Sequence, residues 1–315
     1  MKDNSEEQIP TAVQSIAILG AGAWGSTLAE LARAQGHRVR VWDRRTSPDL
    51  AGALQGVQVM VSAVSMAGVR SLAEAVREIG IPAETILVSA TKGLDPLELL
   101  TPAQIWGATF PQQAVVVLSG PNLSVEIRQG LPAAAVVASR DPWAATRVQQ
   151  AFSSERFRLY TSTDPVGVEL GGTLKNVIAI AVGVCDGLQL GTNARSALVT
   201  RGLAEMIRVG SQLGARPETF NGLSGLGDLL ATCHSPLSRN YRVGYGLGQG
   251  KPLPQVLADI EGTAEGIHTT PVLLKIAAQH GIPVPITQEV QLLLQGQTTP
   301  PAALTRLMER QLKSE

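Results

Sequence analysis

The chain has 315 residues, which is long enough for two domains with separate hydrophobic cores. Lysine plus arginine and aspartate plus glutamate number 26 each, so no excess charge favours nucleic acid or an anionic membrane. The 2 cysteines argue against a disulfide scaffold, and the 4 histidines show no metal-ligand spacing. Residues 1–8 are polar and acidic, unlike a targeting peptide, and the longest apolar stretch, residues 177–185, is too short to span a membrane. We expect a soluble cytoplasmic protein with no metal, no nucleic-acid partner and no membrane insertion.

A glycine-rich loop, GAGAWG at residues 20–25, directly follows the apolar run 16–19 and opens an alanine-rich helical stretch. In such a strand–loop–helix unit, Gly20 makes the tight turn, Gly22 lets the backbone approach a diphosphate, and Gly25 lets helix and strand pack closely. The diphosphate would meet unpaired N–H groups at the positive end of the helix dipole. This context predicts a dinucleotide site, with a ligand-free glycine turn as the alternative.

The next strand, residues 38–42, ends at Asp43, where an acid that binds ribose belongs. Arg44 and Arg45 follow directly. The acid favours a free 2′-hydroxyl, whereas the arginines favour a 2′-phosphate. Because two guanidinium groups outweigh one acid, we expect NADP as the preferred cofactor, with NAD as the alternative.

The first half of the chain alternates short β-rich runs with helical patterns. We expect further strands over residues 57–63, 85–89, 115–119, 135–139 and 157–161, and helices over 69–79, 123–129 and 143–152. Several of the strands are almost continuously apolar, as expected for strands covered on both faces. This alternation predicts an α/β fold for residues 13–163, with a doubly wound, Rossmann-like, largely parallel sheet.

After Asp164 the strand signals stop. Asp164-Pro165 is typical of an N-cap followed by proline at the first helical position, and the helix it opens should run to about Leu188. Further helices are expected over residues 193–213, 239–248, 264–279, 288–294 and 302–312. Residues 164–315 are therefore predicted to form an all-helical C-terminal domain that closes over a ligand at the carboxyl ends of the strands. Only about the first dozen residues are expected to be disordered.

Two loops at the ends of expected strands carry polar groups. Lys92 follows the strand 85–89, and the sequence SGPN at residues 119–122 follows the strand 115–118 and opens a helix. Both positions are suited to meet an anion or a carbonyl group. The simpler alternative is a surface lysine and an ordinary helix cap.

Lys175 lies inside the long helix among apolar and small residues. Gly171 and Gly172 stand one turn before it, and each costs about 1 kcal/mol of helix stability relative to alanine, which calls for a packing or ligand reason. A partly buried lysine can have a lowered pKa and exchange a proton near neutral pH. The alternative is a lysine whose stem is buried and whose ammonium reaches water.

Further candidates follow a glycine run. Asp228 comes after it, with Thr232 one helical turn on, and an acid near a buried lysine would keep the amine charged and oriented. The triplet Ser238, Arg239 and Asn240 begins another helix, where a hydroxyl, a guanidinium and an amide beside free N–H groups suit a phosphate. Ordinary helix caps are the alternative for both.

Together these stretches resemble the bacterial-type NAD(P)-dependent glycerol-3-phosphate dehydrogenases over nearly the whole chain. Besides the glycine loop, the resemblance rests on TKG at 91–93, SGPN at 119–122, LKNV at 174–177, CDG at 185–187, GLGD at 225–228 and SRN at 238–240. The glycine loop belongs to many dehydrogenases, whereas the lysine helix and the SRN triplet in this order are more specific. The resemblance implies hydride transfer between NAD(P)H and dihydroxyacetone phosphate, giving sn-glycerol 3-phosphate for glycerophospholipid synthesis.

The resemblance also implies roles for individual residues. A homodimer is expected from the resemblance alone. Lys175 matches the general acid/base that protonates the alkoxide, and it is grouped with Lys92, Asn122 and Asp228 as catalytic. The substrate positions are Lys92, Gly120, Asn122, Lys175, Asp228 and Thr232, with Ser238, Arg239 and Asn240 at the phosphate. The cofactor positions are Gly20, Gly22, Ala23, Trp24, Gly25, Arg44, Arg45, Lys92, Ser124, Arg239 and Glu265.

Three features depart from the family pattern. Residues 46–55 form a shorter link than usual, Ser65 stands where a proline often follows the third strand, and Asp43 precedes two arginines. These departures bear on cofactor preference rather than on the reaction.

Two other functions stay open at this point. A related two-domain reductase acting on a 2-keto acid without a phosphate would not need the triplet 238–240. A protein that senses NAD(P) without catalysis would have little use for Lys175 beside two glycines.

Overall fold

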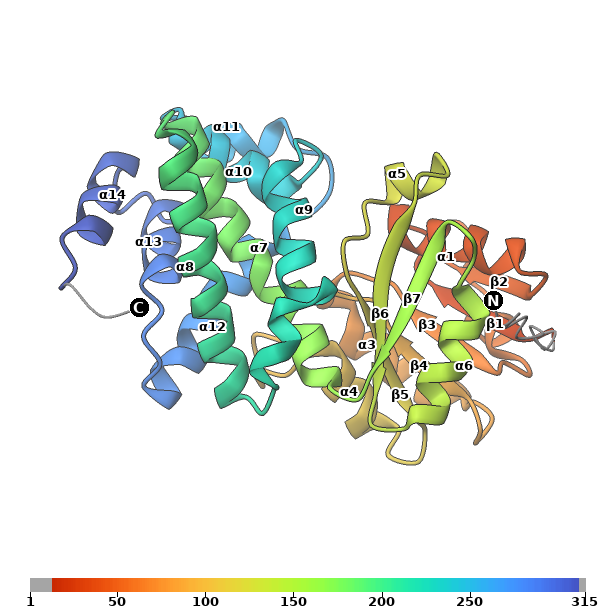
Figure 1. Cartoon of the computed structure of the whole chain (residues 1–315). Helices are drawn as coiled ribbons and strands as arrows, with labels where there is room; N and C mark the ends of the chain where they lie inside the picture. The colour runs from red at the N-terminus through yellow and green to blue at the C-terminus, as the bar shows by residue number, and fades with distance from the viewer. Residues whose placement is uncertain (1–12, 312–315) are drawn as a thin grey trace, which may run out of the picture.

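The computed structural model describes residues 13–311, so the expected disorder of the first dozen residues lies outside the described part of the chain. Figure 1 shows a half built on a sheet and a half built only of helices. The strands are β1 (Ser15–Leu19), β2 (Arg38–Trp42), β3 (Val59–Ser62), β4 (Ile86–Ser89), β5 (Val115–Ser119), β6 (Ala133–Ser139) and β7 (Phe157–Ser162). They form one sheet in the order β2-β1-β3-β4-β5-β6-β7. Every neighbouring pair is parallel except β5–β6, which is antiparallel.

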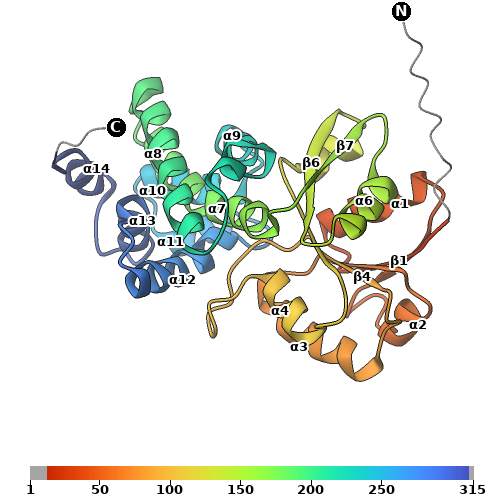
Figure 2. The ribbon, with the colours of Figure 1, turned by 60° about the horizontal axis from the view of Figure 1, so that its bottom comes forward.

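Helices cover both faces of the sheet, as Figure 2 shows. These helices are α1 (Ala23–Ala34), α2 (Leu50–Leu54), α3 (Met66–Ile79), α4 (Pro102–Thr109), α5 (Ser124–Arg128) and α6 (Pro142–Phe152). In β1, Ile16 and Ile18 pack with residues of α1 and α6, whereas Ala17 and Leu19 pack with residues of α3 and α4. Successive residues of a strand face opposite sides, so a strand buried on both faces must be apolar throughout. The predicted α/β, doubly wound sheet is confirmed.

The second half is helical. It contains α7 (Pro165–Gly187), α8 (Gly191–Gln212), a 3₁₀ turn η1 (Pro217–Asn221), a π-helical turn η2 (Leu223–Gly227), α9 (Asp228–His234), α10 (Arg239–Gly248), α11 (Leu253–Ala258), α12 (Glu265–His280), α13 (Pro285–Leu294) and α14 (Pro300–Met308). Within residues 13–311, no strand follows β7. The predicted helical C-terminal region is confirmed, while the domain division at residues 163/164 stays a prediction.

The central helix α7 begins as its sequence predicts. The side chain of Asp164 accepts a hydrogen bond of 2.9 Å from the Gly167 N–H, and Pro165 occupies the first turn. The helix runs from the edge of the sheet half into the middle of the helical half, where α8, α9, α10, α12 and α13 pack against it (Figure 1). Its burial along most of its length explains why its sequence is almost entirely apolar or small.

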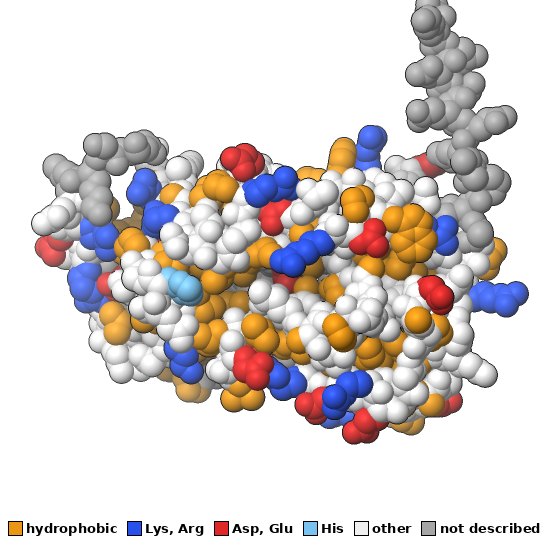
Figure 3. All heavy atoms as spheres, turned by 90° about the horizontal axis from the view of Figure 1, so that it is seen from below, with side chains coloured by type: hydrophobic (Ala, Val, Ile, Leu, Met, Phe, Trp, Pro, Cys, Tyr) orange, Lys and Arg blue, Asp and Glu red, His pale blue; other side chains and the backbone are white. Residues whose placement is uncertain are grey.

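By length and composition alone, α7 would qualify as a membrane-spanning helix. In the fold, however, 94% of its apolar window is buried, which is typical of a core helix. On the face seen in Figure 3, basic and acidic side chains are interspersed, in line with the equal numbers of the two kinds of charge.

Several helix boundaries differ from the predictions. The helix predicted over 302–312 begins at Pro300, because Thr299 caps it and proline suits the first turn, and it ends at Met308. The helix predicted from residue 288 likewise begins earlier, at Pro285. The short helices α2, α4 and α11 were not predicted, since each offers at most two turns of apolar periodicity.

Candidate active site

The glycine loop lies between β1 and α1, where the order of strands reverses around β1 and β3. Gly20 has φ +116°, and a Cβ there would lie 2.7 Å from the Ala63 carbonyl oxygen at the end of β3. A Cβ at Gly25 would lie 1.9 Å from the Gly20 carbonyl oxygen, so helix and loop pack too closely for any side chain. Gly22 has nothing within 4 Å of such an atom and begins α1 without a side-chain cap among the described residues. An uncapped helix start beside open space fits a dinucleotide diphosphate.

Other predicted cofactor residues surround this loop. Ala23 is exposed, and Trp24 is half-buried. The centroid of the Trp24 ring lies 6.4 Å from that of the Phe157 ring, in an edge-to-face arrangement. Ser124 is half-buried at the start of α5, a helix that contacts α1. Their cofactor contacts stay predictions.

The turn after β2 uses its acid internally. Asp43 Oδ1 accepts hydrogen bonds from the Arg45 N–H (3.0 Å), the Thr46 N–H (3.1 Å) and the Thr46 hydroxyl (3.1 Å). The bond from the Arg45 N–H is the main cause that lowers the pKa of Asp43. Arg44 and Arg45 are exposed at the same turn. The carboxylate therefore shapes the turn that presents the two guanidinium groups.

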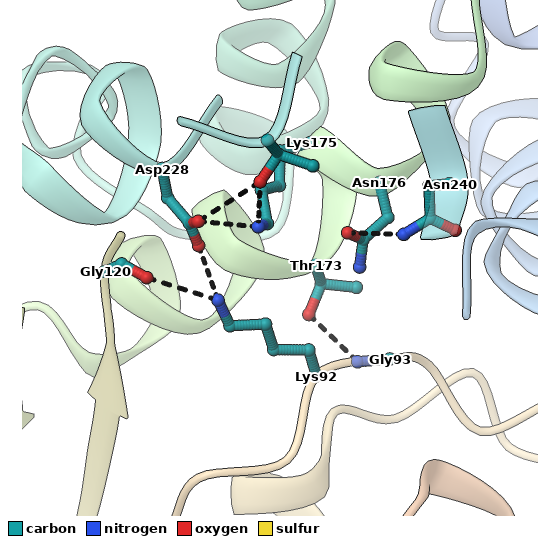
Figure 4. Close-up of polar contacts among 9 residues, drawn as sticks. Lys92, Gly93, Gly120, Thr173, Lys175, Asn176, Asp228 and Asn240 are labelled. Carbon is teal, nitrogen blue, oxygen red and sulfur yellow. Dashed lines mark hydrogen bonds and ion pairs between the residues drawn. The ribbon is translucent and has the colours of Figure 1, made fainter. Parts of the chain in front are cut away.

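A buried cluster of two lysines and one aspartate joins both halves of the molecule (Figure 4). Lys175 Nζ, on α7, lies 2.6 Å from Asp228 Oδ1, and Lys92 Nζ, on the loop after β4, lies 2.5 Å from Asp228 Oδ2. Lys175 Nζ also donates to the Thr232 hydroxyl, and Lys92 Nζ donates to the Gly120 carbonyl over 3.3 Å. The side chains of Asp228 and Lys175 are 3% and 8% exposed, whereas that of Lys92 is 23% exposed.

The cluster has the charge of an anion-binding site. Two ammonium groups share one carboxylate, which leaves a net charge of +1 when all three are ionised. An ammonium has three N–H donors, and Lys175 uses two of them on Asp228 and Thr232. One donor of Lys175 therefore remains for a ligand oxygen.

The pKa of Lys175 is lowered to about 8. Burial is the largest cause, and the charge of Lys92 acts in the same direction, while the carboxylate of Asp228 opposes both. A group with this pKa can give up and regain a proton near neutral pH.

The two glycines before Lys175 have a packing reason. A Cβ at Gly172 would lie 2.2 Å from the Ser119 hydroxyl and 3.2 Å from Lys92 Cε, and one at Gly171 would lie 2.6 Å from the Ser224 carbonyl oxygen. Their absent side chains let the end of β5, the stem of Lys92 and η2 approach α7.

Asn122 follows β5 beside this cluster's Gly120. Its side-chain oxygen and nitrogen are both buried, and neither has a hydrogen-bond partner among residues 13–311. Because buried polar groups are nearly always bonded, this amide is a good candidate to bind a polar ligand.

The SRN triplet begins α10 and is tied to α7. The Ser238 hydroxyl accepts a hydrogen bond of 3.2 Å from the Tyr241 N–H and so caps the helix, as predicted. Asn240 Nδ2 donates to Asn176 Oδ1 over 2.9 Å (Figure 4). Asn240 Oδ1 accepts from the Gly266 N–H over 2.9 Å. Part of the Asn240 amide is therefore committed to holding α7, α10 and α12 together.

Asn176 was not among the predicted site residues, because its pairing with Asn240 links positions 64 residues apart, which no sequence spacing reveals. Arg239 is exposed and lies across Gly262, where a Cβ would meet its guanidinium at 2.7 Å. Burial is the largest cause that raises the pKa of Glu265, while the charges of His268 and Arg239 and a hydrogen bond from the Met66 backbone lower it. The site thus gathers residues from α3, α10 and α12 as well.

Two cavities, of about 380 and 640 Å³, lie elsewhere: neither is lined by the glycine loop or by Lys92, Lys175 or Asp228. The described residues contain no group of three or more His, Cys, Asp or Glu side chains that could hold a metal ion.

A dinucleotide-type loop at the switch point of the sheet and a lysine–aspartate cluster built from both halves are typical of a two-domain nicotinamide-dependent dehydrogenase. The family profile described as the NAD-dependent glycerol-3-phosphate dehydrogenase C-terminus matches residues 164–305, and the profile of the N-terminus matches residues 15–48 and 45–145. The chain belongs to the NAD-dependent glycerol-3-phosphate dehydrogenase family.

Individual relatives agree with this assignment. A glycerol-3-phosphate dehydrogenase (NAD(P)+) of a Synechococcus strain is 81% identical, with 100% of both chains covered. One of a Nostoc strain is 62% identical over 96% of this chain and 98% of its own. The crystal structure of a glycerol-3-phosphate dehydrogenase from Coxiella burnetii superposes with a TM-score of 0.90 at 34% identity, covering 95% of this chain and 99% of its own. A ketopantoate reductase from Ralstonia eutropha, at 15% identity and a TM-score of 0.58, shares the fold alone. The family resemblance noted in the sequence motifs is confirmed.

Proposed function

We propose that the protein reduces dihydroxyacetone phosphate to sn-glycerol 3-phosphate with NADPH or NADH. The observation that carries this proposal is the buried cluster of Lys92, Asp228 and Lys175, which combines a spare ammonium donor with a net positive charge. Such a cluster suits a substrate with a ketone oxygen that becomes an alkoxide during reduction. Membership of the family supports the same reaction.

Lys175 is the proposed general acid. Its remaining N–H is assigned to the ketone oxygen, and its pKa of about 8 lets it protonate the developing alkoxide. Asp228 and Thr232 hold the ammonium in one orientation by accepting its other two hydrogens. A bound nicotinamide dinucleotide supplies the hydride.

Lys92 and Asn122 are the proposed neighbours of the substrate. Lys92 adds a second positive charge and is the more exposed of the two lysines. Asn122 offers an amide that has no other partner in the described structure. The substrate phosphate is assigned to the start of α10, where Arg239 is exposed beside Ser238 and Asn240.

The dinucleotide is assigned to the glycine loop and the start of α1. Arg44 and Arg45 make NADPH the favoured cofactor, because two exposed guanidinium groups outweigh one carboxylate, whose Oδ1 already accepts three hydrogen bonds within the turn. We also propose a cytoplasmic homodimer with domains at residues 13–163 and 164–315, whose product enters glycerophospholipid synthesis.

The test is an assay of NADPH and NADH oxidation with purified protein. Dihydroxyacetone phosphate should support turnover, and unphosphorylated dihydroxyacetone should barely do so. A preference for an unphosphorylated 2-keto acid would indicate the related class of reductase. Nucleotide binding without turnover on any of these substrates would indicate a sensor instead.

A further inference from the structure

One face of α7 holds both ends of the segment that carries Lys92. Near its beginning, the Ser89 hydroxyl donates to Glu169 Oε1 over 3.2 Å. At its end, the Gly93 N–H donates to Thr173 Oγ1 over 3.1 Å (Figure 4). Glu169 and Thr173 are four residues apart on the helix, so their side chains lie one turn apart on the same side.

Lys92 lies between these two anchors. Its stem crosses α7 at Gly172, where a Cβ would come within 3.2 Å of Lys92 Cε. Its ammonium then reaches Asp228 and the Gly120 carbonyl. Three contacts with a single helix, at Glu169, Gly172 and Thr173, thus fix the backbone and the stem of this lysine.

Both anchoring side chains are buried in the protein interior. Glu169 is 3% exposed and Thr173 is 0% exposed. The same oxygen of Glu169 also accepts a hydrogen bond of 2.9 Å from the Ala103 N–H at the start of α4, so the carboxyl group ties β4 and α4 to α7. Neither residue belongs to the lysine–aspartate cluster itself.

We propose that Glu169 and Thr173 are positioning residues that set the place of the Lys92 ammonium relative to Lys175. This proposal rests on the proposed function, in which both lysines act on one substrate. A lysine side chain has a flexible four-carbon stem, so its ammonium is held only as well as its backbone and stem are held. Misplacing a catalytic group by about 1 Å can cost on the order of a hundredfold in rate.

The direct test is Thr173→Val, which keeps the shape of the side chain and removes the acceptor for the Gly93 N–H. We expect kcat for dihydroxyacetone phosphate reduction to fall about tenfold while the Kd for NADPH changes less than about twofold. Thr173→Ser, which keeps the acceptor, should retain kcat within about twofold.

Thr85→Val is the matched control. Thr85 is also buried, and its hydroxyl bonds the Val57 carbonyl over 2.9 Å at the opposite end of β4 from Ser89. Its loss should lower Tm without changing kcat, because the bond does not touch the Lys92 segment. If Thr85→Val lowered kcat as much as Thr173→Val, the loss would be a general effect of destabilisation and the proposal would be wrong.

A double-mutant cycle shows whether Thr173 acts through Lys92. In the Lys92→Ala background, Thr173→Val should lower the remaining kcat by less than about twofold, because the group it positions is gone. A loss of the same factor in both backgrounds would overturn the proposal. Glu169→Ala, at the other end of the segment, provides the same cycle if Thr173→Val does not fold.

Amide hydrogen exchange tests, without an activity assay, whether Thr173 holds the segment 89–93. Exchange of the segment 89–93 should be slow in the wild type and in Thr173→Ser, and faster in Thr173→Val. Equal exchange of this segment in the wild type and in Thr173→Val would overturn the proposed positioning role, whatever the activity. If the wild-type protein did not turn over dihydroxyacetone phosphate, the proposed function itself would be contradicted.

Discussion

At the residue scale, the site depends on how one carboxylate is shared by two ammonium groups. Asp228 gives one oxygen to Lys175 and the other to Lys92, so each lysine is oriented and the net charge stays positive. Burial lowers the pKa of Lys175 to about 8, within reach of neutral pH. The sequence predicted Lys175, Asp228 and Thr232 as neighbours, and the structure brings their side chains together.

The pKa of Lys175 predicts opposite pH profiles for the two directions of the reaction. Reduction needs the protonated amine, so kcat for dihydroxyacetone phosphate should be constant below about pH 8 and fall above it. Oxidation of glycerol 3-phosphate needs the neutral amine, so its kcat should rise through the same pH. Steady-state rates at saturating substrate from pH 6 to 10 measure both. Profiles that move in the same direction would contradict the assignment.

Asp228→Asn tests the cause of this pKa. The carboxylate raises the pKa of Lys175 against burial and Lys92, so its removal should lower that pKa further. The fall in the rate of reduction should then begin at a lower pH than in the wild type. An unchanged midpoint would show that Asp228 does not set the ionisation of Lys175.

The two arginines after Asp43 give a prediction about cofactor choice. Replacing Arg44 and Arg45 together by alanine should weaken NADPH binding at least tenfold and leave NADH binding within about threefold, because only NADPH carries the 2′-phosphate. Fluorescence titration of both nucleotides measures the change. Equal losses for the two nucleotides would assign the arginines another role.

At the scale of elements, the strongest sequence signals predicted structure well. The Asp164-Pro165 pair predicted the start of α7, and the apolar runs predicted the buried strands. The antiparallel β6 could not be predicted, because a strand buried on both faces reads the same in either direction. The contacts of Glu169 with Ser89 and of Thr173 with Gly93 each join residues 80 positions apart, so they depend on the tertiary fold.

Glu169 makes the stability of this junction depend on pH. Burial raises its pKa to about 7 from an ordinary value of 4.5, so the folded protein keeps the proton that the unfolded chain loses. The contribution of protonated Glu169 to the free energy of unfolding is fully present below about pH 4.5 and is lost as pH rises to about 7. Relative to Glu169→Gln, the wild type should lose up to about 3 kcal/mol of unfolding free energy across this range. Urea unfolding at pH 5 and pH 7.5 measures the difference, and a pH-independent difference would contradict it.

At the scale of the whole molecule, the site exists only where the two halves meet. Lys92 and Gly120 come from the sheet half, while Lys175, Asp228 and Thr232 come from the helical half. The helical half alone would keep the Lys175–Asp228 pair, whereas the sheet half alone would leave Lys92 without its carboxylate, so the Lys92–Asp228 ion pair is the contact of this cluster that joins the two halves. The sequence predicted two halves and residues on both, but only the fold shows which contacts connect them.

The central claim is that Lys175 donates the proton, and the variant Lys175→Ala tests it most directly. We expect kcat for dihydroxyacetone phosphate reduction to fall by about a hundredfold to ten-thousandfold. The Kd for NADPH, measured by fluorescence titration of the same preparation, should stay within about threefold, because the glycine loop is untouched. A variant that binds NADPH normally and retains most of the wild-type kcat would contradict the account.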